Sequence, residues 1–262
     1  MNTEIFREYD IRGNVERDLT DEVVRDIGRA FGSYMVSRGK KNASICRDCR
    51  LSSERYRDIL VEAMTGVGLD VTDIGLAPTP LFYFSLFKLD VEGGIMITGS
   101  HNPPTMNGFK IAVDKATLHG EQIQDLRRTI EAGEFVSGKG SFREYGDIVK
   151  DYYEYLRSNI TIGRNFNVVI DAGNGTGGVV AVPIMREFGQ NIKELFCDMD
   201  GRFPNHFPDP TVEANLTALR DTILREKADV GIGYDGDADR IGVVDEKGGI
   251  IWGDYLMLIF AR

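Results

Sequence analysis

Three aspartates stand at alternate positions in the segment YDGDADR at 234–240, namely Asp235, Asp237 and Asp239. In an extended loop alternate side chains point the same way, so the three carboxylates are expected to converge. Like charges this close repel one another unless a cation lies between them. A hard divalent ion with oxygen ligands meets that need, and magnesium suits an open site that also holds phosphate. The pattern therefore predicts a magnesium site, with an acidic solvated turn as the alternative.

A second candidate lies in the segment ITGSHNPP at 97–104, which follows an apolar run. Ser100 stands just beyond the predicted strand, where ligands collect in open α/β sheets. A serine beside a metal can act as a nucleophile or carry a phosphoryl group. A Ser-His-Asp hydrolase is disfavoured, because His101 is adjacent in sequence and no Gly-x-Ser-x-Gly motif surrounds the serine. A plain turn is the alternative.

Cations accompany these two segments. Lys110 follows Ser100 closely, Arg12 lies near the start, and Arg50 belongs to an Arg-Asp-Cys-Arg segment. Beside a phosphorylated serine, Lys110 can handle a proton or balance charge, although most lysines lie on the surface. The Gly-rich segment at 171–178 resembles a phosphate cradle, or else is simply a tight connection.

Helical and strand-like segments alternate along the chain and must position these residues. A cap signal at Thr20 predicts a helix that Gly39 can close, and Ser53 is expected to cap a second helix that ends near Gly66. Strands that alternate with crossover helices predict an α/β fold: two consecutive three-layer α/β/α domains with mostly parallel mixed sheets. Further helices are expected at 78–87, 120–132, 149–160, 178–188 and 212–228, and strands at 43–46, 71–74, 93–98, 107–113, 166–171, 192–197 and 229–234.

The domain boundary is expected near Gly146, after a Gly-rich polar stretch. This predicts one domain at 1–146 with the serine segment and another at 147–252 with the aspartates. The apolar stretch at 253–262 predicts a helix that needs a partner surface, so we expect it to be the first helix of a further domain. A helix docked on the second domain is the alternative.

Charge and composition narrow the class of protein. The formal net charge is 31 − 41 = −10, so nucleic acid and anionic membranes are disfavoured as partners. No run approaches the roughly 20 apolar residues of a membrane span. The start lacks the pattern of a signal peptide, and three cysteines suit a reducing compartment, so a cytoplasmic protein is expected.

These motifs together resemble the α-D-phosphohexomutase family, in order and over essentially the whole chain. The form of the N-terminal and serine motifs is most similar to the phosphomannomutase/phosphoglucomutase branch, and the phosphoglucosamine mutase branch is the alternative. The motifs that carry the resemblance lie at 6–13, 97–104, 107–110, 171–178, 203–210 and 235–240.

The resemblance implies a role for each candidate residue. Ser100 would be the phosphoserine, and one of its oxygens would share the magnesium ion with Asp235, Asp237 and Asp239. His101 and Lys110 would transfer protons, and Arg12 and Arg240 would balance charge around the phosphoryl group. The residues expected to bind substrate are Tyr9, Arg12, Arg50, Asn102 and Lys110.

The implied activity is that of an isomerase, an intramolecular phosphotransferase of carbohydrate metabolism. It would interconvert hexose 1-phosphate and hexose 6-phosphate, with hexose 1,6-bisphosphate as intermediate and activator. The family has four domains, so we expect this chain to be an N-terminal fragment that lacks the C-terminal domains and has weak or no turnover. A non-catalytic sugar-phosphate binding module and a slow metal-dependent phosphatase are the alternatives.

Overall fold

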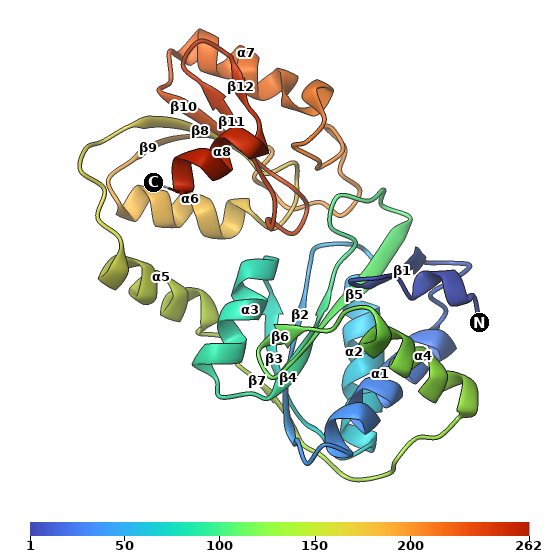
Figure 1. Cartoon of the computed structure of the whole chain (residues 1–262). Helices are drawn as coiled ribbons and strands as arrows, with labels where there is room; N and C mark the ends of the chain where they lie inside the picture. Colours follow the sequence, from blue (N-terminus) through green and yellow to red (C-terminus); the bar gives the residue numbers. More distant parts are fainter. Residues whose placement is uncertain (262) are drawn as a thin grey trace. The chain divides into compact units, whose positions relative to one another are not determined.

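The computed structural model describes residues 1–261, which form two compact units (Figure 1). The first unit comprises residues 1–99 and 103–148. The second comprises Val149 to the end of the described chain, together with the short segment Ser100–Asn102. Each unit contains its own mixed sheet with helices packed on it. The predicted α/β class is confirmed.

The sheet of the first unit has a parallel half and an antiparallel half, in the order β1-β5-β4-β2-β3-β7. The parallel half consists of β4 (Gly93–Ile97), β2 (Asn42–Arg47), β3 (Asp70–Leu76) and β7 (Phe142–Glu144). The antiparallel half adds β5 (Met106–Val113), β1 (Ile11–Asn14) and β6 (Ala116–Thr117). The strands β1, β6 and β7 were not predicted from the sequence. The switch between the halves lies at β4.

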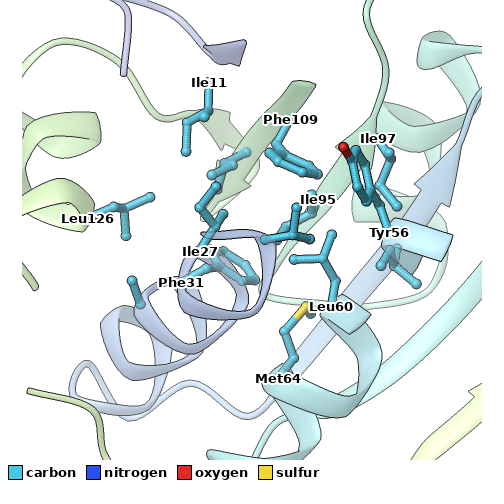
Figure 2. Packing of buried hydrophobic residues seen from close by; sticks show 14 of the residues in the cluster. Ile11, Ile27, Phe31, Tyr56, Leu60, Met64, Ile95, Ile97, Phe109 and Leu126 are labelled. Atoms are coloured by element: carbon cyan, nitrogen blue, oxygen red, sulfur yellow. The ribbon is translucent and has the colours of Figure 1, made fainter. Parts of the chain in front are cut away.

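Helices α1 (Asp21–Val36), α2 (Ser53–Gly66) and α4 (Glu121–Ala132) cover one face of this sheet, and α3 (Thr79–Lys88) covers the other (Figure 1). The short turn η1 (Thr3–Ile5) precedes β1. Helix α1 begins where predicted, because the Thr20 side chain accepts the Val23 N–H. Apolar side chains of α1, α2, α4 and the sheet form one core, and Figure 2 shows Phe31, Tyr56 and Phe109 within it.

The start of α2 differs from the prediction. Ser53 is the first residue of the helix, and Ser52 is the capping residue without a side-chain hydrogen bond. The Ser53 hydroxyl donates to Asp48 Oδ1 at 2.6 Å instead. The expected cap is therefore wrong, because the buried Asp48 carboxylate requires donors and the nearest hydroxyl supplies one.

The second unit has the strand order β12-β11-β10-β8-β9. Strands β8 (Asn167–Asp171), β9 (Asn191–Leu195) and β10 (Val230–Tyr234) run parallel, and β11 (Ile241–Asp245) and β12 (Ile250–Ile251) run antiparallel. Helix α6 (Gly178–Glu187) packs on the face with Val168 and Ile170, and α7 (Thr217–Glu226) packs on the face with Val169. The unit also contains α5 (Ile148–Asn159) and α8 (Gly253–Phe260).

The single helix expected at 212–228 is wrong in its first part. A short 3₁₀ turn, η2 (Glu213–Leu216), precedes α7. Asp209 explains the difference: its side chain accepts the Thr211 N–H and hydroxyl, and its carbonyl accepts the Asn215 side chain. Such local bonds compete with the first turn of a helix.

The helix α8 exposes much of its apolar surface. Leu256 is buried, whereas Tyr255, Met257 and Phe260 are each more than half exposed. Within residues 1–261, no helix combines the length and the hydropathy that a bilayer crossing requires.

Candidate active site

The acid loop, residues 235–240, follows β10 directly. One ligand oxygen from each of Asp235, Asp237 and Asp239 lies within 4.8 Å of the others. Asp235 and Asp237 are fully buried, and Asp239 is exposed. The three carboxylates that the sequence pointed to therefore converge in the second unit.

The loop brings them together by turning, and the expectation of an extended loop is wrong. The Ala238 N–H donates to the Asp235 carbonyl at 3.0 Å, and the Asp235 N–H donates to the Arg240 carbonyl at 3.4 Å. Ala238 has a positive φ of 54°, which a non-glycine residue adopts at a cost. Functional sites are where such strain collects.

The ionised form of Asp235 in the acid loop is energetically unfavourable. Burial raises the pKa of Asp235 well above its usual range, and the neighbouring charges of Asp237 and Asp239 raise it further. The Ser100 hydroxyl and the Arg240 N–H, which both donate to Asp235, act in the opposite direction without cancelling the shift. The charged form of Asp235 is thus disfavoured in its protein surroundings.

Ser100 lies against this cluster. Its hydroxyl donates to Asp235 Oδ2 at 2.7 Å, and His101 Nδ1 lies 3.2 Å from the serine hydroxyl oxygen Oγ. The Ser100 side chain is buried and its φ is 49°, again in the left-handed region. Residues 98–105, which we call the serine loop, therefore present the hydroxyl in a conformation that serine rarely adopts.

The donor set fits a small divalent cation. Three carboxylate oxygens and a hydroxyl are the hard oxygen ligands that Mg²⁺ and Ca²⁺ take. Opposite ligands of Mg²⁺ lie about 4.2 Å apart, so oxygens within 4.8 Å of one another need little adjustment to bind it. A dication there also removes the repulsion that raises the pKa of Asp235.

The Gly-rich turn at 171–178 supports the acid loop. Thr176 donates twice to the Gly236 carbonyl, from its N–H at 3.0 Å and from its hydroxyl at 3.1 Å. A Cβ at Gly175 would lie 2.6 Å from that carbonyl oxygen, so glycine allows the close approach. Of the two interpretations of this segment, the structure favours a tight connection over a phosphate cradle.

Two of the predicted cations of the first unit share one face of its sheet. Arg12 on β1 pairs with Gly108, and Lys110 lies two residues along β5, so both side chains leave the same face. Arg12 donates to Asp10 Oδ2 at 2.7 Å and to the Gly99 carbonyl at 3.4 Å. Both cations are largely buried. Arg12 is therefore fixed beside the residue that precedes Ser100.

Arg50, which was expected to bind substrate, lies inside the first unit. Its side chain is fully buried and donates to Asp48, to the Pro103 carbonyl at 2.7 Å and to the Met106 carbonyl at 2.8 Å. Asp48 also accepts the Gly99 N–H at 3.3 Å. Direct binding of substrate by Arg50 is disfavoured, because its guanidinium group is engaged in holding the serine loop.

The remaining predicted residues differ in exposure. The Tyr9 side chain is 68% exposed in the first unit. Asn102 is half-buried and belongs to the second unit with Ser100. Arg240 is exposed, and its backbone N–H donates to Asp235 Oδ1 at 3.0 Å, so its main chain helps to fix the first carboxylate.

Comparison with known families and proteins identifies the fold. Residues 3–137 match the profile of phosphoglucomutase/phosphomannomutase α/β/α domain I, and residues 150–249 match the profile of domain II. The chain belongs to this family. The predicted resemblance to the phosphohexomutases is thereby confirmed.

Individual members of the phosphoglucomutase/phosphomannomutase family are similar over nearly the whole chain. A phosphomannomutase/phosphoglucomutase of Pseudomonas aeruginosa is 43% identical over 98% of this chain and 56% of its own length. A phosphoglucomutase of Neisseria gonorrhoeae is 40% identical over 100% of this chain and 57% of its own. The crystal structure of a family protein from Burkholderia thailandensis superposes with a TM-score of 0.96 at 38% identity, covering 100% of this chain and 58% of that one. The chain thus spans about half the length of the curated relatives it matches.

The sequence patterns did not indicate the residues that hold the two loops of this candidate site. Asp48 anchors the serine loop, Thr176 anchors the acid loop, and Asp171 pairs with His206 beside the Gly-rich turn. All of these except Asp48 lie in motifs that carried the resemblance. The motifs themselves were a signal, but nothing in them says which side chain contacts the neighbouring loop.

Proposed function

We propose that this chain carries the phosphoserine site of a phosphohexomutase that interconverts the 1- and 6-phosphates of glucose and mannose. The observation that carries the proposal is the contact of the Ser100 hydroxyl with Asp235 within the triple-aspartate cluster. The names of the relatives, phosphomannomutase/phosphoglucomutase and phosphoglucomutase, support the choice of sugars.

Asp235, Asp237 and Asp239 would hold a magnesium ion together with an oxygen on Ser100. When bound, the ion supplies positive charge against the phosphoryl oxygens and the buried carboxylates. The carboxylates orient it, and the turn of the acid loop sets their spacing.

The transfer itself is an exchange of one P–O bond for another. The bond between phosphorus and Ser100 Oγ breaks while phosphorus bonds to a sugar hydroxyl oxygen. The proton of that hydroxyl passes to a base, for which Lys110 is the candidate, and Oγ takes up a proton as it leaves. The other phosphoryl group of the resulting bisphosphate then returns to Oγ in the reverse sense. We assign to His101 the exchange of a proton with that oxygen, and the distance of 3.2 Å between His101 Nδ1 and Oγ supports this role. Phosphoryl transfer depends mainly on such positioning and on charge stabilisation.

Further predicted residues would complete the charge balance. We assign Lys110 to proton transfer or charge support, Arg12 to charge support, and Tyr9 and Asn102 to the sugar phosphate. The fixed position of Arg12 beside Gly99 supports this assignment. Hexose 1,6-bisphosphate would act as activator by phosphorylating Ser100. Within the described residues Cys46, Cys49 and Cys197 form no disulfide, which suits work in the cytoplasm.

Phosphorylation of Ser100 tests the proposal directly. The dephosphorylated chain is incubated with magnesium and glucose 1,6-bisphosphate labelled in its phosphoryl groups, and label and intact mass are followed with time. We expect one phosphoryl group per chain, none in Ser100→Ala, and about 100-fold slower uptake in Asp237→Asn. Ser158→Ala is the matched control, because that serine is exposed on α5 and contacts only its own helix.

The other outcomes separate the alternative functions. Undiminished labelling of Ser100→Ala would remove this serine from the mechanism. Saturable binding of glucose 1-phosphate without labelling would favour a binding module. Steady release of inorganic phosphate, lost in Asp237→Asn, would favour a phosphatase.

A further inference from the structure

His206 has a hydrogen-bond acceptor at each of its ring nitrogens. Nε2 lies 3.1 Å from both carboxylate oxygens of Asp171, and Nδ1 lies 2.8 Å from the Phe207 carbonyl oxygen. A neutral imidazole carries one N–H, whereas the imidazolium carries two. The doubly protonated ring is therefore the form that satisfies both contacts with an ionised Asp171.

The surroundings of the ring favour its charged form. Asp171 is buried and is the charged group that the described residues place against the ring. Two further neighbours, the Phe196 ring at 5.4 Å and Gly173, contribute no charge. Burial by itself lowers the pKa of His206, but the hydrogen bond and charge of Asp171 and the Phe207 carbonyl together raise it above its ordinary value.

The charged pair stands at the base of the Gly-rich turn. Asp171 ends β8, and its Oδ1 also accepts the Gly173 N–H at 2.9 Å. Gly173 has a φ of 53°, and a Cβ there would lie 3.3 Å from the His206 ring and 3.0 Å from Pro208. The turn is thus held between the carboxylate on one side and the ring and Pro208 on the other.

The far end of the same turn holds the acid loop. Thr176 donates two hydrogen bonds to the Gly236 carbonyl, which lies between Asp235 and Asp237 in the sequence. Pro208 also reaches this point, because a Cβ at Gly236 would lie 3.4 Å from it. A continuous set of contacts therefore leads from the His206 ring to the backbone between the two buried carboxylates.

We propose that His206 is a positioning residue of the metal site: as the imidazolium it clamps Asp171 and Pro208 around the Gly-rich turn, and so fixes the spacing of Asp235 and Asp237. Loss of the ring proton leaves one acceptor without a donor and loosens the turn. Affinity for Mg²⁺ then falls as the pH rises through the pKa of His206. This inference rests on the metal site of the proposed function, but it does not depend on phosphoryl transfer.

The test is Mg²⁺ binding by isothermal titration calorimetry from about pH 6 to about pH 9, around the ordinary titration range of histidine. For the native chain we expect affinity to fall about tenfold across the alkaline part of this range, the lower end of what residues supporting metal ligands contribute. His206→Gln should bind about tenfold more weakly at the acid end and show no alkaline fall. His119→Gln is the matched control, because His119 is exposed in the first unit and contacts Gln122.

Two more variants separate a proton-dependent clamp from a merely structural role. Asp171→Asn should move the alkaline fall to lower pH, because the ring loses the charge that favours its protonation. Thr176→Val should weaken Mg²⁺ binding at every pH without moving the fall. Thermal melts followed by circular dichroism check that each variant folds.

Each result has a definite meaning. An alkaline fall that persists unchanged in His206→Gln, or one that is missing from the native chain, overturns the inference and leaves the proposed function intact. No Mg²⁺ binding by the native chain overturns both. Failure of Ser100 to accept a phosphoryl group, with the His206-dependent profile present, overturns the proposed transfer and leaves the inference standing.

Discussion

The serine loop and the acid loop occupy equivalent positions in two different sheets. Strand β4 pairs in parallel with β2 and antiparallel with β5, and β10 pairs in parallel with β8 and antiparallel with β11. Each loop leaves its sheet at the strand where the pairing switches. Each also contains a non-glycine residue with positive φ, Ser100 in one and Ala238 in the other. Both units thus use the same topological position to present functional groups.

The two loops differ in how their charges are balanced. Behind the serine loop, the buried Asp48 carboxylate is paired with the Arg50 guanidinium and accepts a backbone N–H from Gly99. In the acid loop, the buried Asp235 carboxylate stands next to two further carboxylates, and uncharged donors of Ser100 and the backbone serve it. The first loop is thus held by its own ion pair, whereas in the second the charged form of Asp235 is disfavoured by burial and by the neighbouring carboxylates.

The largest change in stability is expected when the ion pair between Asp48 and Arg50 is broken. Asp48→Ala leaves the buried Arg50 guanidinium without its carboxylate, so the free energy of unfolding should fall by about 3 kcal/mol. Urea unfolding followed by circular dichroism measures this. Asp58→Ala, which removes an exposed partner of Arg57, is the control and should change less than about 0.5 kcal/mol. Equal losses in the two variants would mean that the pair does not hold the loop.

In the acid loop we expect a substitution to raise the free energy of unfolding rather than to lower it. Without metal, Asp235→Asn should stabilise the second unit by about 0.5 to 2 kcal/mol, because it removes a buried charge beside two others. The raised pKa of Asp235 means that the native chain loses stability as the pH rises through that pKa, whereas the variant does not. Fluorescence of Trp252, the one tryptophan of the chain, follows unfolding in urea.

Added Mg²⁺ should make the native chain more stable than Asp235→Asn. The native chain is expected to gain stability from added Mg²⁺, since the ion binds the folded form, and Asp235→Asn to gain little. The contrary result would be that, in the absence of metal, Asp235→Asn is less stable than the native chain. It would show that groups of the protein already stabilise the charge of the Asp235 carboxylate.

The smallest change in stability is expected when one hydrogen bond from Thr176 to the acid loop is removed. Thr176→Val removes one of two hydrogen bonds to the Gly236 carbonyl, so we expect a loss of about 0.5 kcal/mol, since the Thr176 N–H keeps that oxygen satisfied. Thr217→Val, whose hydroxyl contacts a carbonyl in an exposed turn, is the control. Trp252 fluorescence again measures the change, and a loss equal to that of Asp48→Ala would contradict the ranking.

Capping residues and apolar spacing were sufficient to predict many helices and strands from the sequence, but not all of them. Helix α1 has a capping Thr20 and a regular apolar face, and both act within a few residues, so its start was predictable. Strands β1 and β7 lack alternation and exist because β5 and β3 pair with them. The helix expected at 212–228 begins only at Thr217. Asp209 accepts hydrogen bonds from Thr211 and Asn215, and these bonds compete with the first helical turn.

The sequence by itself determined the candidate groups: a serine after one buried strand, three aspartates after another, and cations near the first. Their residue types and their places at strand ends are local properties, and the family resemblance rests on the same motifs. The tertiary structure alone decided that the Ser100 hydroxyl touches Asp235, 135 residues away in sequence. It likewise decided that Arg50 is buried and that the Gly-rich turn supports the acid loop. Such contacts join segments far apart in the chain, so they depend on strand pairing and packing that no local pattern specifies.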